Sequence, residues 1–83
     1  MFIFNKMEKV DNRANVMLAR MKFEKDWRLS AAESMEIQAS HIDKPENYII
    51  KQALLDAACK LRREVLEIND GYYKLKDVMD RLH

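Results

Sequence analysis

The chain has 83 residues, about a third of them charged, and a formal net charge of only +1. This length makes one small domain of limited stability, and so small a net charge argues against a general nucleic-acid or membrane surface. One glycine, one proline and one cysteine leave few turn residues for a sheet and exclude an intrachain disulfide. Composition therefore predicts an all-α protein, and the lone cysteine favours a reducing, cytoplasmic location.

The first predicted helix covers about residues 7–25. Its apolar side chains recur at alternating steps of three and four residues, the spacing of one helix face, at Met7, Val10, Ala14, Met17 and Met21. The stripe is lost after residue 21, because Phe23, Trp27 and Leu29 fall at strand-like alternate positions instead. We therefore expect this helix to end near residue 25.

A short second helix is predicted over residues 31–42. Ser30 has the character of an N-cap, and Glu33 follows three residues later, as in a capping box. Ala32, Met35, Ala39 and Ile42 then form a short helical stripe.

The third predicted helix is long and covers residues 45–83. Asp43 is placed to cap it, Pro45 fits a first turn where the missing N–H costs nothing, and Glu46 favours the positive helix end. Within it, the residues 69–71 (Asn-Asp-Gly) have the composition of a turn. The apolar stripe keeps its phase across them, which favours one continuous helix and leaves a break at 69–71 as the alternative.

Both long stripes have the spacing of a heptad seam, with one four-residue insertion in the C-terminal one. A helix that ran from residue 46 to 83 would be about 57 Å long and would project from a compact domain, so we expect a second chain to cover its seam. The predicted fold is thus a small domain of three to four helices, assembled as a dimer or higher oligomer. The predicted oligomer or partner interface comprises Val10, Met17, Met21, Leu61, Val65, Ile68, Tyr72, Leu75, Met79 and Leu82.

Motifs of catalysis, cofactors and metals are not found in the sequence. A phosphate-binding loop needs several glycines, and Gly71 stands alone. Zinc sites need clustered Cys and His, whereas the chain has only Cys59, His41 and His83. We therefore expect no catalytic residue, no cofactor and no metal, and a protein that is not an enzyme.

Two side chains outside the seams carry open alternatives. Cys59, between Ala58 and Lys60, is expected to be a buried small side chain, with a reactive exposed thiol as the alternative. Trp27 is expected to anchor the core of the domain, or else to be an exposed hot spot for a partner.

The expected function is that of a non-enzymatic adaptor, regulator or inhibitor, which binds itself and another protein through amphipathic helix faces. Such compositions are common among bacterial and phage accessory proteins. The alternative is a DNA-binding regulator, because a strand at 23–29 followed by two helices resembles the ribbon-helix-helix fold in outline. Glu24 and Asp26 would then face the phosphates with the wrong charge, which makes DNA the less favoured partner. No stretch approaches the length of a membrane span, so a membrane is not expected as a partner.

Overall fold

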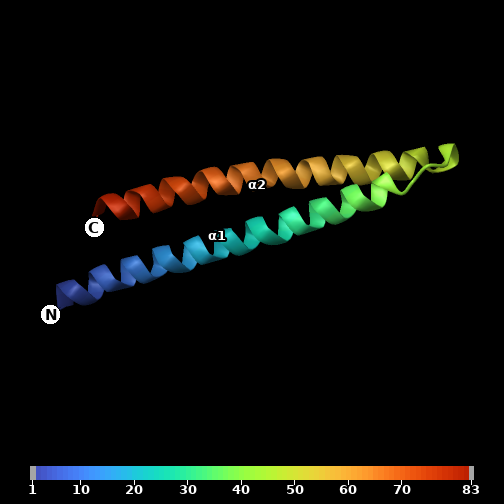
Figure 1. Cartoon of the computed structure of the whole chain (residues 1–83). Coiled ribbons are helices and arrows are strands. Elements are labelled where there is room, and N and C mark those ends of the chain that lie inside the picture. The colour runs from blue at the N-terminus through green and yellow to red at the C-terminus, as the bar shows by residue number, and fades with distance from the viewer. Residues whose placement is uncertain (1, 83) are drawn as a thin grey trace.

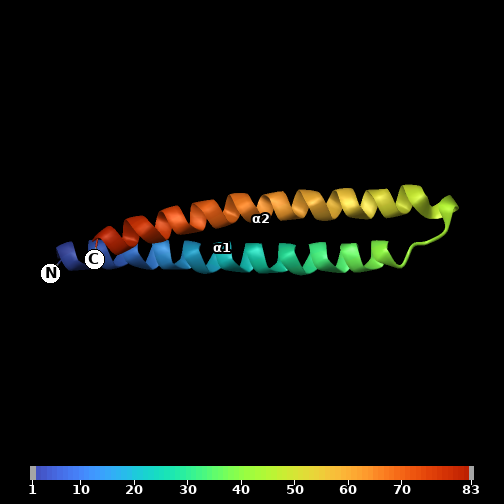
Figure 2. The same cartoon turned by 45° about the horizontal axis from the view of Figure 1, so that its top comes forward.

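The computed structural model describes the backbone of residues 2–82 and the side chains of residues 11–82. The chain forms a helical hairpin, in which α1 (Phe2–Ser40) is joined to α2 (Tyr48–Leu82) by a loop with one 3₁₀ turn, η1 (Pro45–Asn47). The two long helices run antiparallel, side by side, and both termini lie at the end opposite the loop (Figure 1, Figure 2).

The hairpin is far from globular. Its longest dimension is 69 Å and its radius of gyration is 19.2 Å, whereas a compact chain of this length would have a radius of about 12 Å. The predicted all-α class is confirmed for the described residues. The predicted number of helices is wrong, because there are two long helices and not three or four.

The correction to the helix count lies at residues 26–30, where α1 continues without interruption. Ser30 is an interior helix residue and not an N-cap, and the capping box with Glu33 does not form a helix start. The expected helices 7–25 and 31–42 are therefore parts of one helix of 39 residues, except that this helix ends at Ser40 and residues 41–42 belong to the loop. The residues 23–29, which were expected to alternate as a strand, are helical as well.

The apolar stripe of α1 breaks because two charged residues occupy seam positions. From Met21, steps of four and three residues lead to Lys25, Arg28 and Ala32. Lys25 and Arg28 are only partly exposed, because their long stems lie along the interhelical boundary while the charged groups reach its edge. The seam is thus continuous in space, although its hydrophobicity is interrupted in the sequence.

The loop between the helices begins with a tightened last turn of α1. The backbone N–H of His41 donates to the carbonyl of Gln38 at 3.2 Å, and that of Ile42 donates to the carbonyl of Ala39 at 3.1 Å. Lys44, and not Asp43, is the residue that precedes the 3₁₀ turn, and it makes no side-chain cap. Pro45 lies in the first turn, as predicted.

The second helix passes through residues 69–71 without a break, in agreement with the unbroken phase of its stripe. Gly71 has no positive φ, and a Cβ built on it would meet only the Met21 methyl carbon, Cε, at 3.8 Å, which is ordinary contact. The composition of residues 69–71 is typical of a turn. The buried face of α2 packs on α1 both before and after Gly71, and this shared packing favours a continuous helix.

The core is narrow and small side chains form its centre. The described apolar residues that are almost fully buried are Ala32, Ala39, Ala58 and Val65. Contacts between Lys25 and Tyr72, between Arg28 and Glu64 and between Glu36 and Arg62 cross the seam between the antiparallel helices. Three of the four buried residues are alanines, so the helices can approach closely where these residues lie.

Candidate interaction surface

Most of the predicted interface residues face the other helix of the same chain. In α2 the seam side chains are buried or half-buried, and α1 is the element that covers them; they are Leu61, Val65, Ile68, Tyr72, Leu75 and Met79. Met21 of α1 is half-buried on the matching face. Within one chain α1 lies along the α2 seam, so this seam is covered without a second chain (Figure 2).

Two of the predicted interface residues lie elsewhere, and a third is outside the described side chains. Met17 and Leu82 are exposed and do not enter the interhelical core. Val10 falls outside the residues whose side chains the structure describes. The seam between the helices is therefore an intramolecular core, and an interaction surface has to be sought on the outer faces of the hairpin.

Charged side chains clamp the two helices together along the edges of the seam. On one edge, Arg28 Nη1 lies 2.6 Å from Glu24 Oε2, and Arg28 Nε lies 3.5 Å from Glu64 Oε2 on α2. The ammonium group of Lys25 lies 5.9 Å from the centroid of the Tyr72 ring. The contacts from Arg28 to Glu64 and from Lys25 to Tyr72 join α1 to α2 where the α1 seam lacks apolar side chains.

Glu36 and Arg62 make a bidentate ion pair on the other edge. Arg62 Nε donates to Glu36 Oε2 at 2.9 Å, and Nη2 donates to Oε1 at 2.6 Å. The pair is partly exposed, so its contribution to stability is modest, and its fork geometry joins α1 to α2 on this edge.

The ion pairs shift the pKa values of their members in the expected directions. The hydrogen bond from Arg62 lowers the pKa of Glu36, and Glu36 in turn raises the pKa of Arg62. The hydrogen bond from the Trp27 indole, followed by that from Arg28, lowers the pKa of Glu24. All of these shifts favour the charged forms and do not create a proton donor or acceptor near neutral pH.

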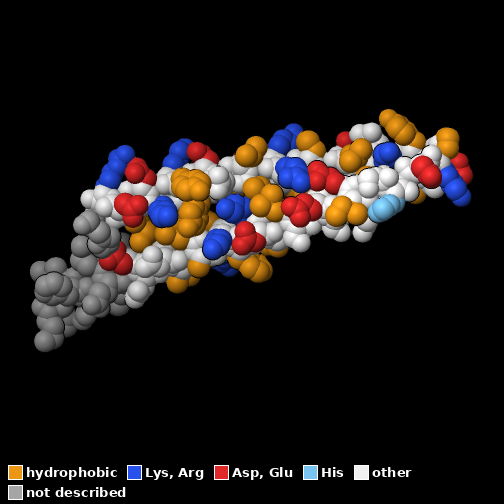
Figure 3. Space-filling view, in the orientation of Figure 1, with side chains coloured by type: hydrophobic (Ala, Val, Ile, Leu, Met, Phe, Trp, Pro, Cys, Tyr) orange, Lys and Arg blue, Asp and Glu red, His pale blue; other side chains and the backbone are white. Residues whose placement is uncertain are grey.

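Apolar side chains gather between the helices and also in patches along the outer edges of the hairpin (Figure 3). One such patch lies on α1, on the side turned away from α2. Val16, Phe23 and Trp27 follow one another at steps of seven and four residues and so lie on one face of α1. We call these three residues the α1 outer row.

The α1 outer row is exposed, and two contacts orient Trp27 within it. Val16 and Phe23 are each 65% exposed, and Trp27 is 42% exposed. The Trp27 indole N–H donates to Glu24 Oε2 at 2.7 Å, and the Arg28 guanidinium carbon lies 4.5 Å from the indole centroid. Trp27 therefore does not anchor the core, and these two contacts hold its ring in one orientation on the surface.

Cys59 is exposed, which corrects the expectation that its side chain is buried. Ala58 takes the buried position instead, with 1% exposure. Successive residues on a helix point about 100° apart, so only one member of the run Ala57-Ala58-Cys59 can point straight at α1. Composition alone gave no reason to choose Ala58 over Cys59.

The described residues contain no metal-binding cluster, and their best-defined depressions are open. Among them, no group of three or more His, Cys, Asp or Glu side chains is placed to hold a metal ion. The surface depressions are open, and those that are best defined are each lined by a single helix, for example by Glu33, Glu36, Ile37 and Ser40. Neither described helix has a stretch apolar enough over a sufficient length to cross a membrane.

The chain matches no known protein family, and it has no match among curated proteins or solved structures. Conclusions about its function therefore rest on the hairpin itself.

Proposed function

We propose that the protein is a non-enzymatic interaction protein that presents the outer face of α1 to a protein partner. The observation that carries this proposal is the α1 outer row of Val16, Phe23 and Trp27, three large apolar side chains that remain exposed on one helix face. Large aromatic side chains contribute most to binding energy in protein interfaces, and helix faces of this spacing fit apolar grooves.

The order of the Trp27 ring supports the same role. Glu24 and Arg28 hold the indole from two sides before any partner arrives. A side chain that is already fixed in one orientation loses little entropy when it binds, so more of the contact energy appears as affinity.

The charges beside the row indicate the chemistry of the partner. Arg13 and Arg20 lie beside the row at exposed positions, on the same side of it. They favour a partner whose apolar groove has an acidic rim, because complementary charges speed encounter and fix orientation.

The ribbon-helix-helix alternative loses its structural basis. That fold needs a strand that enters the major groove, and residues 23–29 would have to supply it. These residues are helical, and none of the described residues 2–82 forms a strand. Duplex DNA is therefore not proposed as the partner.

The proposal is tested by photo-crosslinking with p-benzoylphenylalanine in place of Phe23, in an extract of the cells that produce the protein. We expect a discrete covalent adduct that excess unlabelled protein suppresses. A Trp27→Ala competitor should be at least tenfold weaker than the wild type, because hot-spot truncations exceed about 2 kcal/mol. A Val78→Ala competitor, changed at an exposed apolar residue of α2, should match the wild type.

Trp27→Ala should leave the melting curve close to that of the wild type, because the ring is not in the core. A loss of about 3–5 kcal/mol, as for a core aromatic, would contradict the proposal, as would an adduct that both competitors suppress equally.

A further inference from the structure

The hairpin exposes more surface than a compact chain of its mass. Its accessible surface is 6911 Å² at a mass of 9.9 kDa, whereas the size scaling of folded monomers gives about 5,200 Å². The excess of about 1,700 Å² is roughly twice the ~800 Å² that each partner contributes to a standard protein interface. A further interface can therefore form without opening the seam between the helices.

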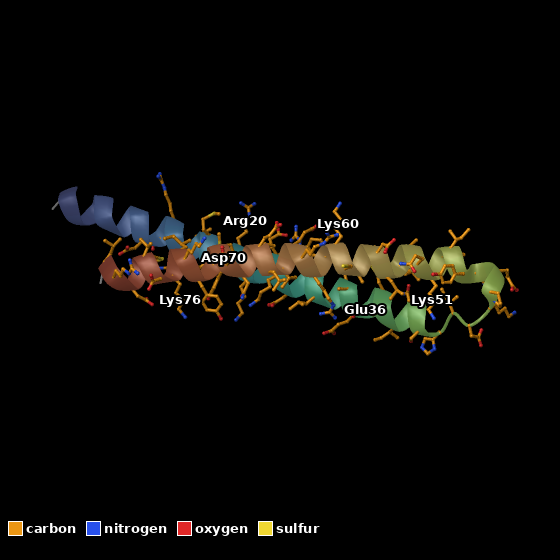
Figure 4. All side chains as sticks on the ribbon, turned by 90° about the horizontal axis from the view of Figure 1, so that it is seen from above. Arg20, Glu36, Lys51, Lys60, Asp70 and Lys76 are labelled. Carbon is orange, nitrogen blue, oxygen red and sulfur yellow. The ribbon has the colours of Figure 1, made fainter. Side chains whose placement is uncertain are left out.

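A second row of exposed apolar side chains follows the outer face of α2. Tyr48, Leu55, Leu66 and Tyr73 are all exposed, and at 100° per residue they fall within an arc of about 20° on the helix. We call these four residues the α2 outer row. In Figure 4, Lys60 points to one side of α2 and Lys76 points to the other. At 100° per residue the α2 outer row lies between these two directions.

The α2 outer row is the same when it is read in either direction. Its members follow one another at steps of seven, eleven and seven residues, with tyrosine at both ends and leucine at both inner positions. A pattern with this symmetry is self-complementary, because a two-fold rotation brings each member onto a residue of its own kind.

We infer that α2 pairs antiparallel with α2 of a second copy through this row, in a two-fold dimer whose axis crosses α2 near residues 60–61. Tyr48 of one copy then packs on Tyr73 of the second copy, and Leu55 packs on Leu66 of the second copy. Each contact occurs twice, as in any two-fold interface. The α1 outer row lies on the far side of the hairpin and remains available to another protein.

The charges beside the row fit this antiparallel pairing. Asp56 and Arg63 lie on the same side of the α2 outer row, and the two-fold axis near residues 60–61 brings Asp56 opposite Arg63 of the second copy. Arg62 lies at the row itself, but its bidentate pair with Glu36 draws the guanidinium toward α1. In the antiparallel dimer, opposite charges therefore meet across the interface on this side of the row.

The first test is the molar mass at 100 µM by light scattering coupled to size exclusion. We expect twice 9.9 kDa for the wild type. Leu55→Glu with Leu66→Glu should give the monomer mass with its helical circular dichroism kept, because both residues are on the outer face. The matched control is Ile49→Glu with Val78→Glu, two exposed apolar residues of α2 outside the row, which should remain dimeric.

A second test uses the exposed Cys59 and needs no change in the row. In the antiparallel dimer the two copies of Cys59 lie near the axis, so a short bis-maleimide should link them into a covalent dimer. A cysteine moved to the end of the helix, by Cys59→Ser with Asp80→Cys, should not crosslink, because its two copies would lie about 60 Å apart along the helix axis at 1.5 Å per residue.

A wild-type mass of 9.9 kDa would overturn the inference. Two other results would also overturn it. One is a dimer mass for the variant Leu55→Glu with Leu66→Glu. The other is equal dissociation of the dimer by the control variant Ile49→Glu with Val78→Glu. Equal crosslinking through Cys59 and through a cysteine at position 80 would show a parallel dimer and refute the antiparallel pairing. If the row variant loses its helix, the crosslinking result decides. None of these readouts depends on a partner for the α1 outer row, so the two proposals can fail separately.

Discussion

The close approach of α1 and α2 can be tested by enlarging one buried alanine. Ala58 is 1% exposed and Ala32 and Ala39 of α1 are fully buried, so a larger side chain at position 58 would have to displace its neighbours in the seam. Ala58→Leu adds three carbon atoms at this contact and forces the helices apart or the side chain out of its preferred rotamer. Overpacking of this kind costs about 1–3 kcal/mol.

The matched control is Ala53→Leu, an exposed alanine one and a half turns earlier on α2. Both changes alter intrinsic helix propensity by the same small amount, so the difference between them isolates the packing at Ala58. For a domain of this size, 1 kcal/mol corresponds to about 4–8 °C in melting temperature. We therefore expect Ala58→Leu to melt about 5–20 °C below Ala53→Leu.

The assay is thermal and urea unfolding followed by far-ultraviolet circular dichroism. Both variants are compared at one protein concentration, because self-association makes the melting temperature depend on concentration. Equal melting of the two variants would refute the reasoning, since it would mean that Ala58 does not lie at a close contact between the helices.

Three further predictions follow from the same structure. Gly71→Ala should raise the free energy of unfolding by about 0.5–1 kcal/mol, because Gly71 is inside a helix without positive φ and the new methyl group meets only Met21 at an ordinary distance. A urea titration that shows a lower free energy of unfolding would contradict the continuous helix. The pKa of Glu36 is lowered in the folded state, so its pairing with Arg62 stabilises the hairpin at pH values above the unfolded pKa of the carboxyl. This contribution is lost as pH falls through the lowered folded pKa. The stability of Glu36→Gln should therefore be less sensitive to acid than that of the wild type, and equal pH profiles would count against the pair. Selection from a random duplex pool should give no defined DNA sequence, since the described residues supply no strand to enter a groove and the net charge is only +1; recovery of a defined, strongly salt-dependent site would show DNA binding.

The helical class and the buried face of α2 could both be predicted from the amino-acid sequence. Few turn residues and a repeating step of three and four residues leave little alternative to helix, because only a helix brings such positions onto one face. The same argument placed Leu61, Val65 and Ile68 on the buried face and carried the helix through Gly71. Local periodicity was sufficient here because the apolar stripe is uninterrupted.

Periodicity failed in α1 because its seam contains charged residues. Lys25 and Arg28 are compatible with the seam only because Tyr72 and Glu64 stand opposite them on α2. Those partners are more than 30 residues away in the sequence. A pattern confined to α1 therefore indicates an end to the helix where the folded chain has none.

Which element covers each helix face could not be predicted from the stripes and follows from the path of the folded chain. A stripe shows that a face is buried, but it does not show whether the covering helix belongs to the same chain or to another. The loop after Ser40 turns α2 back along α1, so the seam is satisfied within the chain. The rotation of each helix about its axis is set by the whole interface between α1 and α2 and not by any one residue. This rotation leaves Trp27 and Cys59 exposed and buries Ala58.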